Sequence, residues 1–164
     1  MNALARPEVG EYLNGRFVST YVKVATFKLA GTQKQGGNVA GYFCTPDGRV
    51  LHAVAGPVDA RALLREARWV VDTHKLFEAE NPGGNAAELR TWFFKAHADR
   101  LRDEHGLDLD DAGSPGKPLD NQGRAHLLLA AAPLPRIEHV YKLVFEKVLN
   151  EKISTSPVIE TGPR

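Results

Sequence analysis

The chain lacks several features that mark particular classes of protein. Its 164 residues contain one cysteine, Cys44, so no intrachain disulfide, CxxC pair or cysteine-based zinc cluster can form. Lys and Arg number 21 against 20 Asp and Glu, a net charge of +1, which is too little to bind nucleic acid or an anionic membrane by charge alone. The sequence has no long apolar run and no signal-peptide core at its start. We therefore expect a protein without a nucleic-acid or membrane partner. Its location is expected to be cytoplasmic by default, although a longer natural N-terminus could carry an export signal.

What the chain does contain is typical of a folded globular protein. Apolar residues make up 43% and charged residues 25% of the sequence, so wholesale disorder is excluded. The length suits one domain, or one domain with a helical appendage. Along the chain, short apolar runs with glycine-rich breaks give way to apolar residues at helical spacing. We therefore predict an α/β domain over residues 1–80, a helical extension over 81–151 and a flexible tail over 152–164.

The first part of the chain alternates short apolar runs with breaks. Pro7 and Asn14-Gly15 bound a predicted helix over 7–14. The β-branched and aromatic residues of 17–24 favour a strand, and the glycines of 30–38 favour a loop.

A hairpin is the clearest local signal. Apolar runs at 39–45 and 49–55 flank Pro46-Asp47-Gly48. Pro presets the backbone for a turn and Gly accepts a positive φ, so the two runs are predicted to pair as antiparallel strands.

Four helices are predicted after the hairpin. Asp59 can cap a long helix, and Asn85 with Glu88 resembles a capping box for the next one. The expected buried face of the first comprises Ala60, Leu63, Leu64, Ala67, Val71 and His74, and that of the second comprises Leu89, Trp92, Phe93 and Ala96. Beyond a solvated linker over 106–120, further helices are predicted near 121–132 and 136–150.

No residue stands out as catalytic. Cys44 lies between Phe43 and Thr45 in an apolar strand, where burial raises the pKa of a thiol, so we interpret it as a core residue. Use of Cys44 by a monothiol enzyme is a weaker alternative.

The six histidines do not form a metal-binding motif in the sequence. His97 and His105 share an acidic helix, but eight residues correspond to about 12 Å of helix rise, too far for one ion. We predict that both lie at the surface among solvated charges, and that His52 and His126 are structural. No metal and no cofactor is expected.

Other partial motifs have simpler explanations. Residues 108–113 begin like a calcium loop, but Leu119 stands where the bidentate carboxylate belongs, so an acidic linker is predicted. The glycines of 31–36 have P-loop spacing without the required Lys and Ser or Thr. Arg61, Arg65 and Arg68 are predicted to form an exposed basic stripe, with docking of an acidic partner as a minor alternative.

The order of motifs within residues 7–72 resembles the thioredoxin-like superfamily. The passage from Pro7 to Val18 looks like the helix and strand that follow that family's redox motif. The run Phe43-Cys44-Thr45-Pro46-Asp47-Gly48 looks like its final hairpin, and Gly56-Pro57-Val58-Asp59 looks like the turn into its last helix. The resemblance implies a thioredoxin-like sheet.

The chain departs from the family pattern at its functional centre. The CxxC and the strand before it would lie upstream of residue 1, and Val39 occupies the place of the family's cis-proline, where we expect a trans bond. Residues 28–37 are too short and glycine-rich for the family's intervening helix. The strand that would lie between 16–25 and 39–45 is missing, so the sheet is expected to be incomplete. These two segments could pair directly, the C-terminal helices could shield a smaller sheet, or the chain could lack a natural N-terminal segment.

Two functions follow from these expectations. The first is a non-catalytic binding or scaffold module for an unidentified protein or peptide. The alternative is a thiol–disulfide oxidoreductase represented here without its CxxC segment, for which this sequence offers no catalytic residue.

Overall fold

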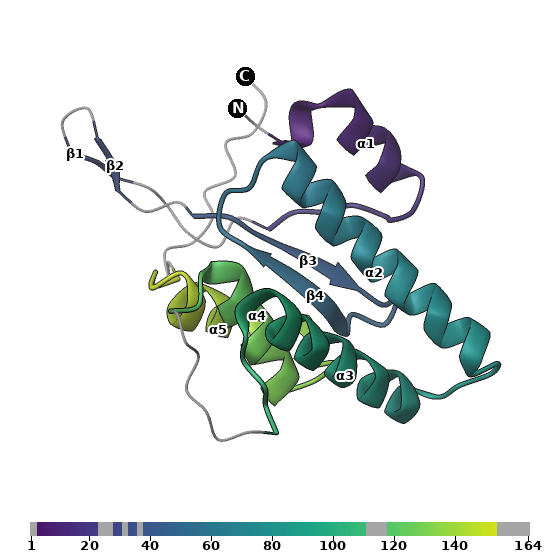
Figure 1. The fold of residues 1–164 in the computed structure, drawn as a ribbon. Helices are drawn as coiled ribbons and strands as arrows, with labels where there is room; N and C mark the ends of the chain where they lie inside the picture. Colours follow the sequence, from purple (N-terminus) through teal and green to yellow (C-terminus); the bar gives the residue numbers. More distant parts are fainter. Residues whose placement is uncertain (1–2, 23–27, 31–32, 36–37, 111–117, 154–164) are drawn as a thin grey trace.

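The computed structural model describes residues 3–22, 28–30, 33–35, 38–110 and 118–153 (Figure 1). The fold is mixed α/β, with helices packed around a two-stranded antiparallel sheet. Most of the predicted tail over 152–164 lies outside the described residues.

The predicted hairpin is confirmed. Strand β3 (Ala40–Cys44) pairs with β4 (Val50–Ala55), with Ala40 opposite Ala55 and Phe43 opposite His52. Gly48 in the turn has a φ of 80°, a conformation that other residues adopt only with strain. No described peptide bond is cis, which agrees with the trans bond expected at Val39.

Two predictions for the segment before the hairpin are wrong. Residues 17–22 of the predicted strand 17–24 pair with no described strand, and residues 23–24 lie outside the described part. The predicted loop 30–38 instead contains strand β2 (Gln33–Gln35) and the last residue of β1 (Lys28–Ala30), and these two strands pair. Glycine content disfavours a helix but still permits so short a hairpin, whereas β-propensity alone does not supply a strand with a partner.

The predicted helices are all present. They are preceded by a 3₁₀ turn, η1 (Ala3–Ala5), and comprise α1 (Pro7–Asn14), α2 (Ala60–Glu80), α3 (Ala86–His105), α4 (Asn121–Ala131) and α5 (Ile137–Leu143), the last continuing into a π-helical turn, η2 (Val144–Val148). Asp59 caps α2 by accepting a hydrogen bond from the Ala62 amide, and Asn85 forms a complete capping box with Glu88.

The buried face of α2 differs from the predicted one. Leu63 and Ala67 are buried as expected, but the buried face continues through Glu66, Val70 and Thr73 rather than Val71 and His74. The hydrophobic pattern could not reveal this rotation because it scores a glutamate as a solvent-facing residue.

Two hydrophobic clusters hold the helices against the sheet. The first joins α1, α2 and α3 to the hairpin and includes Val9, Phe43, Leu51, Val54, Leu63, Ala67, Val70, Phe77, Leu89 and Phe93. The second joins α4, α5 and η2 to the hairpin and includes Val50, Ala53, Ala55, Ala125, Leu129, Val140, Val144 and Val148. Every residue of β4 is buried, and Figure 1 shows this strand between α2 on one side and α3 and α4 on the other. Residues on both sides of the predicted boundary at 81 therefore pack on the same two strands.

The outer edge of β4 is closed by groups from the helical part of the chain. The Val50 amide donates to the Pro135 carbonyl at 2.9 Å. Farther along, the carbonyl of Leu51 meets His97 Nε2 and that of Ala53 accepts from the Gln122 amide, both at 3.0 Å. The C-terminal helices therefore shield the edge of β4. The shielding expected from the sequence concerned the opposite edge, beside 39–45, where the family's strand is missing.

Among the described residues, no helix is long and apolar enough to cross a membrane.

Candidate functional site

Three histidines from three elements meet in the interior. His52 projects from β4, His97 from α3 and His126 from α4, and their exposed fractions are 0%, 1% and 0%. One ring nitrogen of each lies within 4.8 Å of those of the other two. Together, the rings of His52, His97 and His126 form what we call the histidine cluster.

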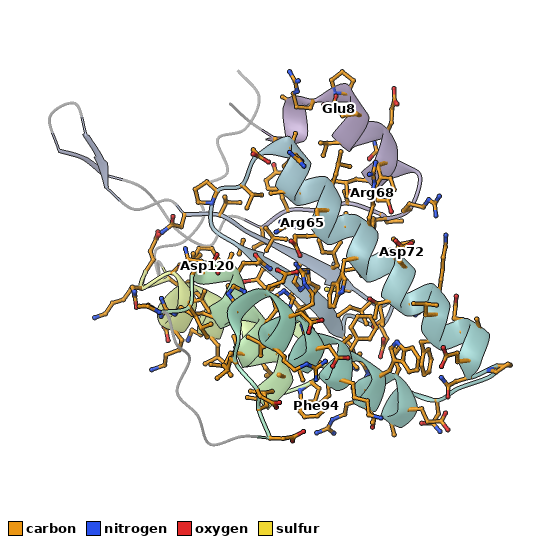
Figure 2. The ribbon with its side chains drawn as sticks, in the orientation of Figure 1. Glu8, Arg65, Arg68, Asp72, Phe94 and Asp120 are labelled. Carbon is orange, nitrogen blue, oxygen red and sulfur yellow. The ribbon has the colours of Figure 1, made fainter. Side chains whose placement is uncertain are left out.

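A buried carboxylate, that of Glu66, lies beside the histidine cluster and contacts His52. Glu66 of α2 accepts a hydrogen bond from His52 Nε2 at 3.0 Å and two from the Arg100 guanidinium at 2.5 and 3.2 Å. Arg65 donates to the same carboxylate at 2.8 and 2.9 Å, and Arg100 also donates to Glu104. Figure 2 shows Arg65, Arg68 and Asp72 following one another along α2.

The ionisation of Glu66 follows from these donors. Burial raises the pKa of its carboxyl, but hydrogen bonds from His52 and Arg100 outweigh burial and hold the pKa well below the usual range. Glu66 is therefore a carboxylate at neutral pH and can only accept hydrogen bonds.

The hydrogen bonds assign one tautomer to each ring of the histidine cluster. Because Glu66 can only accept, His52 carries its proton on Nε2. The Gln122 amide nitrogen also lies 3.1 Å from this atom, but it donates to the Ala53 carbonyl. His97 also carries its proton on Nε2, which donates to the Leu51 carbonyl at 3.0 Å. Its Nδ1 then accepts from Nδ1–H of His126 at 2.7 Å.

All three rings are neutral. Burial lowers the pKa of His97 to about 3, with a further contribution from His52. Burial, followed by repulsion from the protonated forms of His52 and His97, also lowers the pKa of His126. The pKa of His52 is also lowered, because burial outweighs the stabilising effect of Glu66 on its protonated form.

These assignments leave two nitrogen lone pairs without a donor. His52 Nδ1 and His126 Nε2 are buried and have no hydrogen-bond partner among the described residues. Trp69 packs its ring at 4.9, 5.2 and 5.5 Å from the centroids of His52, His97 and His126. A buried acceptor without a donor costs about 1–3 kcal/mol of folding free energy. Packing of the rings alone does not account for two such nitrogens in one cluster.

The sequence prediction for His97 is wrong. His97 is buried rather than exposed, because its partners come from β4 and α4 and not from its own helix. Spacing along one helix cannot detect such a group. His52 and His126 are buried, but the sequence contains no signal that the three histidines meet, nor that Glu66 lies beside them.

The remaining candidates are placed much as the sequence predicted. Cys44 is partly buried, and its pKa is raised to about 11 by burial and by Glu138. Arg61, Arg65 and Arg68 are exposed along α2. In the acidic linker, Asp108 and Asp110 are exposed, whereas residues 111–117 lie outside the described part.

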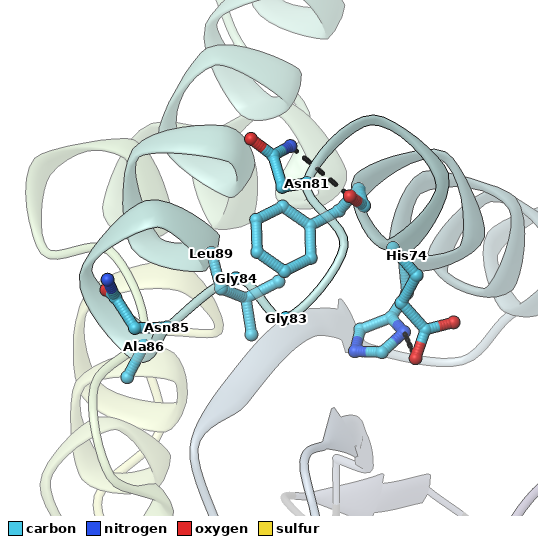
Figure 3. A pocket seen from close by; sticks show the side chains of 9 residues that line it. His74, Asn81, Gly83, Gly84, Asn85, Ala86 and Leu89 are labelled. Atoms are coloured by element: carbon cyan, nitrogen blue, oxygen red, sulfur yellow. Dashed lines mark hydrogen bonds and ion pairs between the residues drawn. The ribbon is translucent and has the colours of Figure 1, made fainter.

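A surface pocket lies where α2 turns into α3 (Figure 3). His74 and Glu78 form a pair at 3.6 Å on one side, and the Asn81 side chain donates to the Phe77 carbonyl. The other lining residues are Gly83, Gly84, Asn85, Ala86 and Leu89. These residues bring no nucleophile to the pocket, and its polar side chains already have partners or cap α3, so the histidine cluster remains the stronger candidate site.

Comparison with protein-family models, curated proteins and solved structures finds no match to this chain.

Proposed function

We propose that this chain is a non-catalytic binding module of thioredoxin-like architecture that takes up an extended peptide along the outer edge of β3. The observation that carries the proposal is the contrast between the two edges of the hairpin. The outer edge of β4 is closed by His97 and Gln122, whereas β3 has no second strand partner among the described residues.

The register shows which backbone groups the edge of β3 offers. Gly56 donates to the Val39 carbonyl, and hydrogen-bonded pairs alternate along an antiparallel ladder. The next such pairs are therefore Gly41 with Val54 and Phe43 with His52. The N–H and C=O groups of the intervening residues, Ala40 and Tyr42, face outward, as an added strand requires.

An exposed apolar segment lies near this edge. Phe17 packs on Phe43 of β3, with ring centroids 5.1 Å apart, and the chain then passes β3 on the side away from β4 (Figure 1). Along it, Val18 is fully exposed, and Tyr21 and Val22 are 91% and 78% exposed. Exposed apolar side chains near a strand edge favour association with another chain. We therefore expect the bound peptide to carry apolar side chains.

The resemblance to the thioredoxin-like superfamily also favours the outer edge of β3 as the place where a peptide binds. In that family a strand lies between the segments that match 16–25 and 39–45. A bound peptide would occupy the corresponding position beside β3.

The absence of catalysis rests on the lone thiol. Cys44 has a raised pKa, and the sequence contains no second cysteine to resolve a mixed disulfide. We expect no turnover in an insulin-reduction assay with dithiothreitol, and turnover by this chain would contradict the non-catalytic proposal.

The binding proposal can be tested with a displayed library of random twelve-residue peptides. Ala40→Pro removes an outward N–H without removing a β3–β4 hydrogen bond, since proline is tolerated on the open side of an edge strand. Ala40→Ser is the matched control, because serine keeps the N–H. We expect peptides selected on the native chain to bind Ala40→Ser equally well and Ala40→Pro at least tenfold more weakly.

The folding of both variants is checked by circular dichroism. Equal binding by Ala40→Pro, or a library that yields no binder above background, would contradict the proposal.

A further inference from the structure

We propose that the histidine cluster is a binding site for Zn²⁺, with His52, His97 and His126 as its three protein ligands. A single ion there would link β4, α3 and α4. The site is independent of the β3 edge and would stabilise the fold rather than carry out chemistry.

The donor set is suited to zinc. Each neutral imidazole has one bare nitrogen, and imidazole nitrogen is a preferred ligand of Zn²⁺. Tetrahedral bonds of 2.0–2.1 Å place ligand nitrogens about 3.3 Å apart. One ring nitrogen of each histidine is already within 4.8 Å of those of the other two. Binding would replace the 2.7 Å hydrogen bond from His126 Nδ1–H to His97 Nδ1, and ring rotations would bring the bare nitrogens to this spacing.

The groups behind the rings are those found behind metal-binding histidines. Such histidines typically donate their second ring N–H to a carboxylate or a backbone carbonyl, which fixes the ring and its tautomer. His52 donates to the Glu66 carboxylate, and His97 donates to the Leu51 carbonyl. Both hydrogen bonds leave Nδ1 as the unprotonated nitrogen, which has no partner in His52 and accepts from His126 in His97.

The two histidine nitrogens without a hydrogen-bond partner also favour a bound ion. His52 Nδ1 and His126 Nε2 are buried acceptors without a donor, and metal coordination satisfies a bare lone pair without a proton. In the bound form, the ring proton of each histidine lies on the nitrogen that does not face the ion.

The surroundings of the histidine cluster are close to electrically neutral. The carboxylates of Glu66 and Glu104 are balanced by the guanidinium groups of Arg65 and Arg100. Affinity for the ion therefore depends on the three nitrogens, so loss of any one of them should be clearly measurable.

Burial makes the site structural rather than catalytic. Three protein ligands leave a fourth position for water or a small anion, but the three rings are at most 1% exposed. A substrate has no route to an ion held there in the folded chain.

The test uses the untagged full chain, stripped of metal with a chelator and titrated with Zn²⁺ in competition with a chromophoric chelator. We expect one equivalent to bind and to raise the unfolding temperature. His52→Gln and His126→Gln should each lower the affinity at least a hundredfold, and Glu66→Gln should lower it about 10–100-fold through His52. His139→Gln, which changes an exposed histidine, is the matched control and should bind as the native chain does.

Two results would overturn the proposal. One is a folded native chain that binds no Zn²⁺ at micromolar concentration, and the other is undiminished affinity in both buried-histidine variants. If these variants do not fold, the ¹⁵N resonances of the native histidines decide. Shifts of His52, His97 and His126 on adding Zn²⁺ support the site, and shifts confined to the other histidines refute it.

Discussion

Glu66 is the residue on which most of the buried polar contacts converge. It is 1% exposed and accepts hydrogen bonds from His52, Arg65 and Arg100. Its charge also fixes the tautomer of His52, because a carboxylate that cannot donate requires a proton on the facing nitrogen. One residue thus connects α2 to both the histidine cluster and α3.

Replacing Glu66 with glutamine should destabilise the chain. Glu66→Gln keeps the volume but removes the charge that compensates buried Arg100, so we expect the free energy of unfolding to fall by about 2–3 kcal/mol in urea denaturation. Asp99→Asn, which breaks an exposed pair with Arg102, should have little effect. Equal stability of Glu66→Gln and Asp99→Asn would show that the buried pair is unimportant.

Cys44 should react slowly as long as the chain is folded. Its pKa of about 11, against an ordinary value of about 8.5, leaves roughly a hundredth or less of the usual thiolate at pH 8. We expect alkylation by iodoacetamide to be slower by that factor than in the urea-unfolded chain, and to accelerate as the pH rises towards 11. Equal rates in the folded and unfolded chain would contradict the raised pKa.

Residue-level prediction from the sequence succeeded where chemistry is local. The environment of Cys44 follows from its neighbours in an apolar strand. His97 and Glu66 could not be placed correctly, because their burial depends on partners that are 46 and 34 residues away in the sequence, Leu51 and Arg100.

Helix boundaries are the element-scale feature that the sequence predicts best. Asp59 and Asn85 cap α2 and α3 as expected, since a cap is formed by residues two or three positions apart. Segment 17–22 shows the opposite case. Its β-propensity is high, but a strand requires a partner, and no described strand provides one.

Loss of a cap should weaken α2 measurably. The Asp59 side chain accepts from the Ala62 amide at 2.7 Å, and Asp59→Ala removes this bond, so we expect a loss of about 1 kcal/mol. Asp72→Ala, the same substitution at an exposed position within α2, should leave stability nearly unchanged. Equal losses from both substitutions would mean that the cap does not stabilise the helix.

The whole molecule is organised around β4. Both hydrophobic clusters pack on it, and α3 and α4 cover its outer edge, while no described strand pairs with the other edge of β3. The sequence predicted the hairpin and the helices that surround it, but not this asymmetry between the edges, because it depends on where the helices pack.

Stability of the metal-free chain should decrease in acid. The three histidines have lowered pKa values in the folded state, so below about pH 6.5 the unfolded chain binds protons that the folded chain does not. The stability present above this pH is therefore lost as the pH falls towards about 3, the pKa of His97. Each such histidine contributes up to about 1.4 kcal/mol per pH unit.

Urea denaturation at a series of pH values measures this slope. His139→Gln should preserve it, because that side chain is exposed. A free energy of unfolding that does not change between about pH 7 and pH 5 would contradict the neutral, buried state of the three rings.

The most direct measurement of the histidine cluster is a long-range ¹H–¹⁵N correlation spectrum of the imidazoles in the metal-free chain at neutral pH. The hydrogen bonds predict neutral rings, with the proton on Nε2 in His52 and His97 and on Nδ1 in His126. A charged ring at any of these three positions, or the rapidly exchanging tautomers of an exposed histidine, would contradict this organisation of the core.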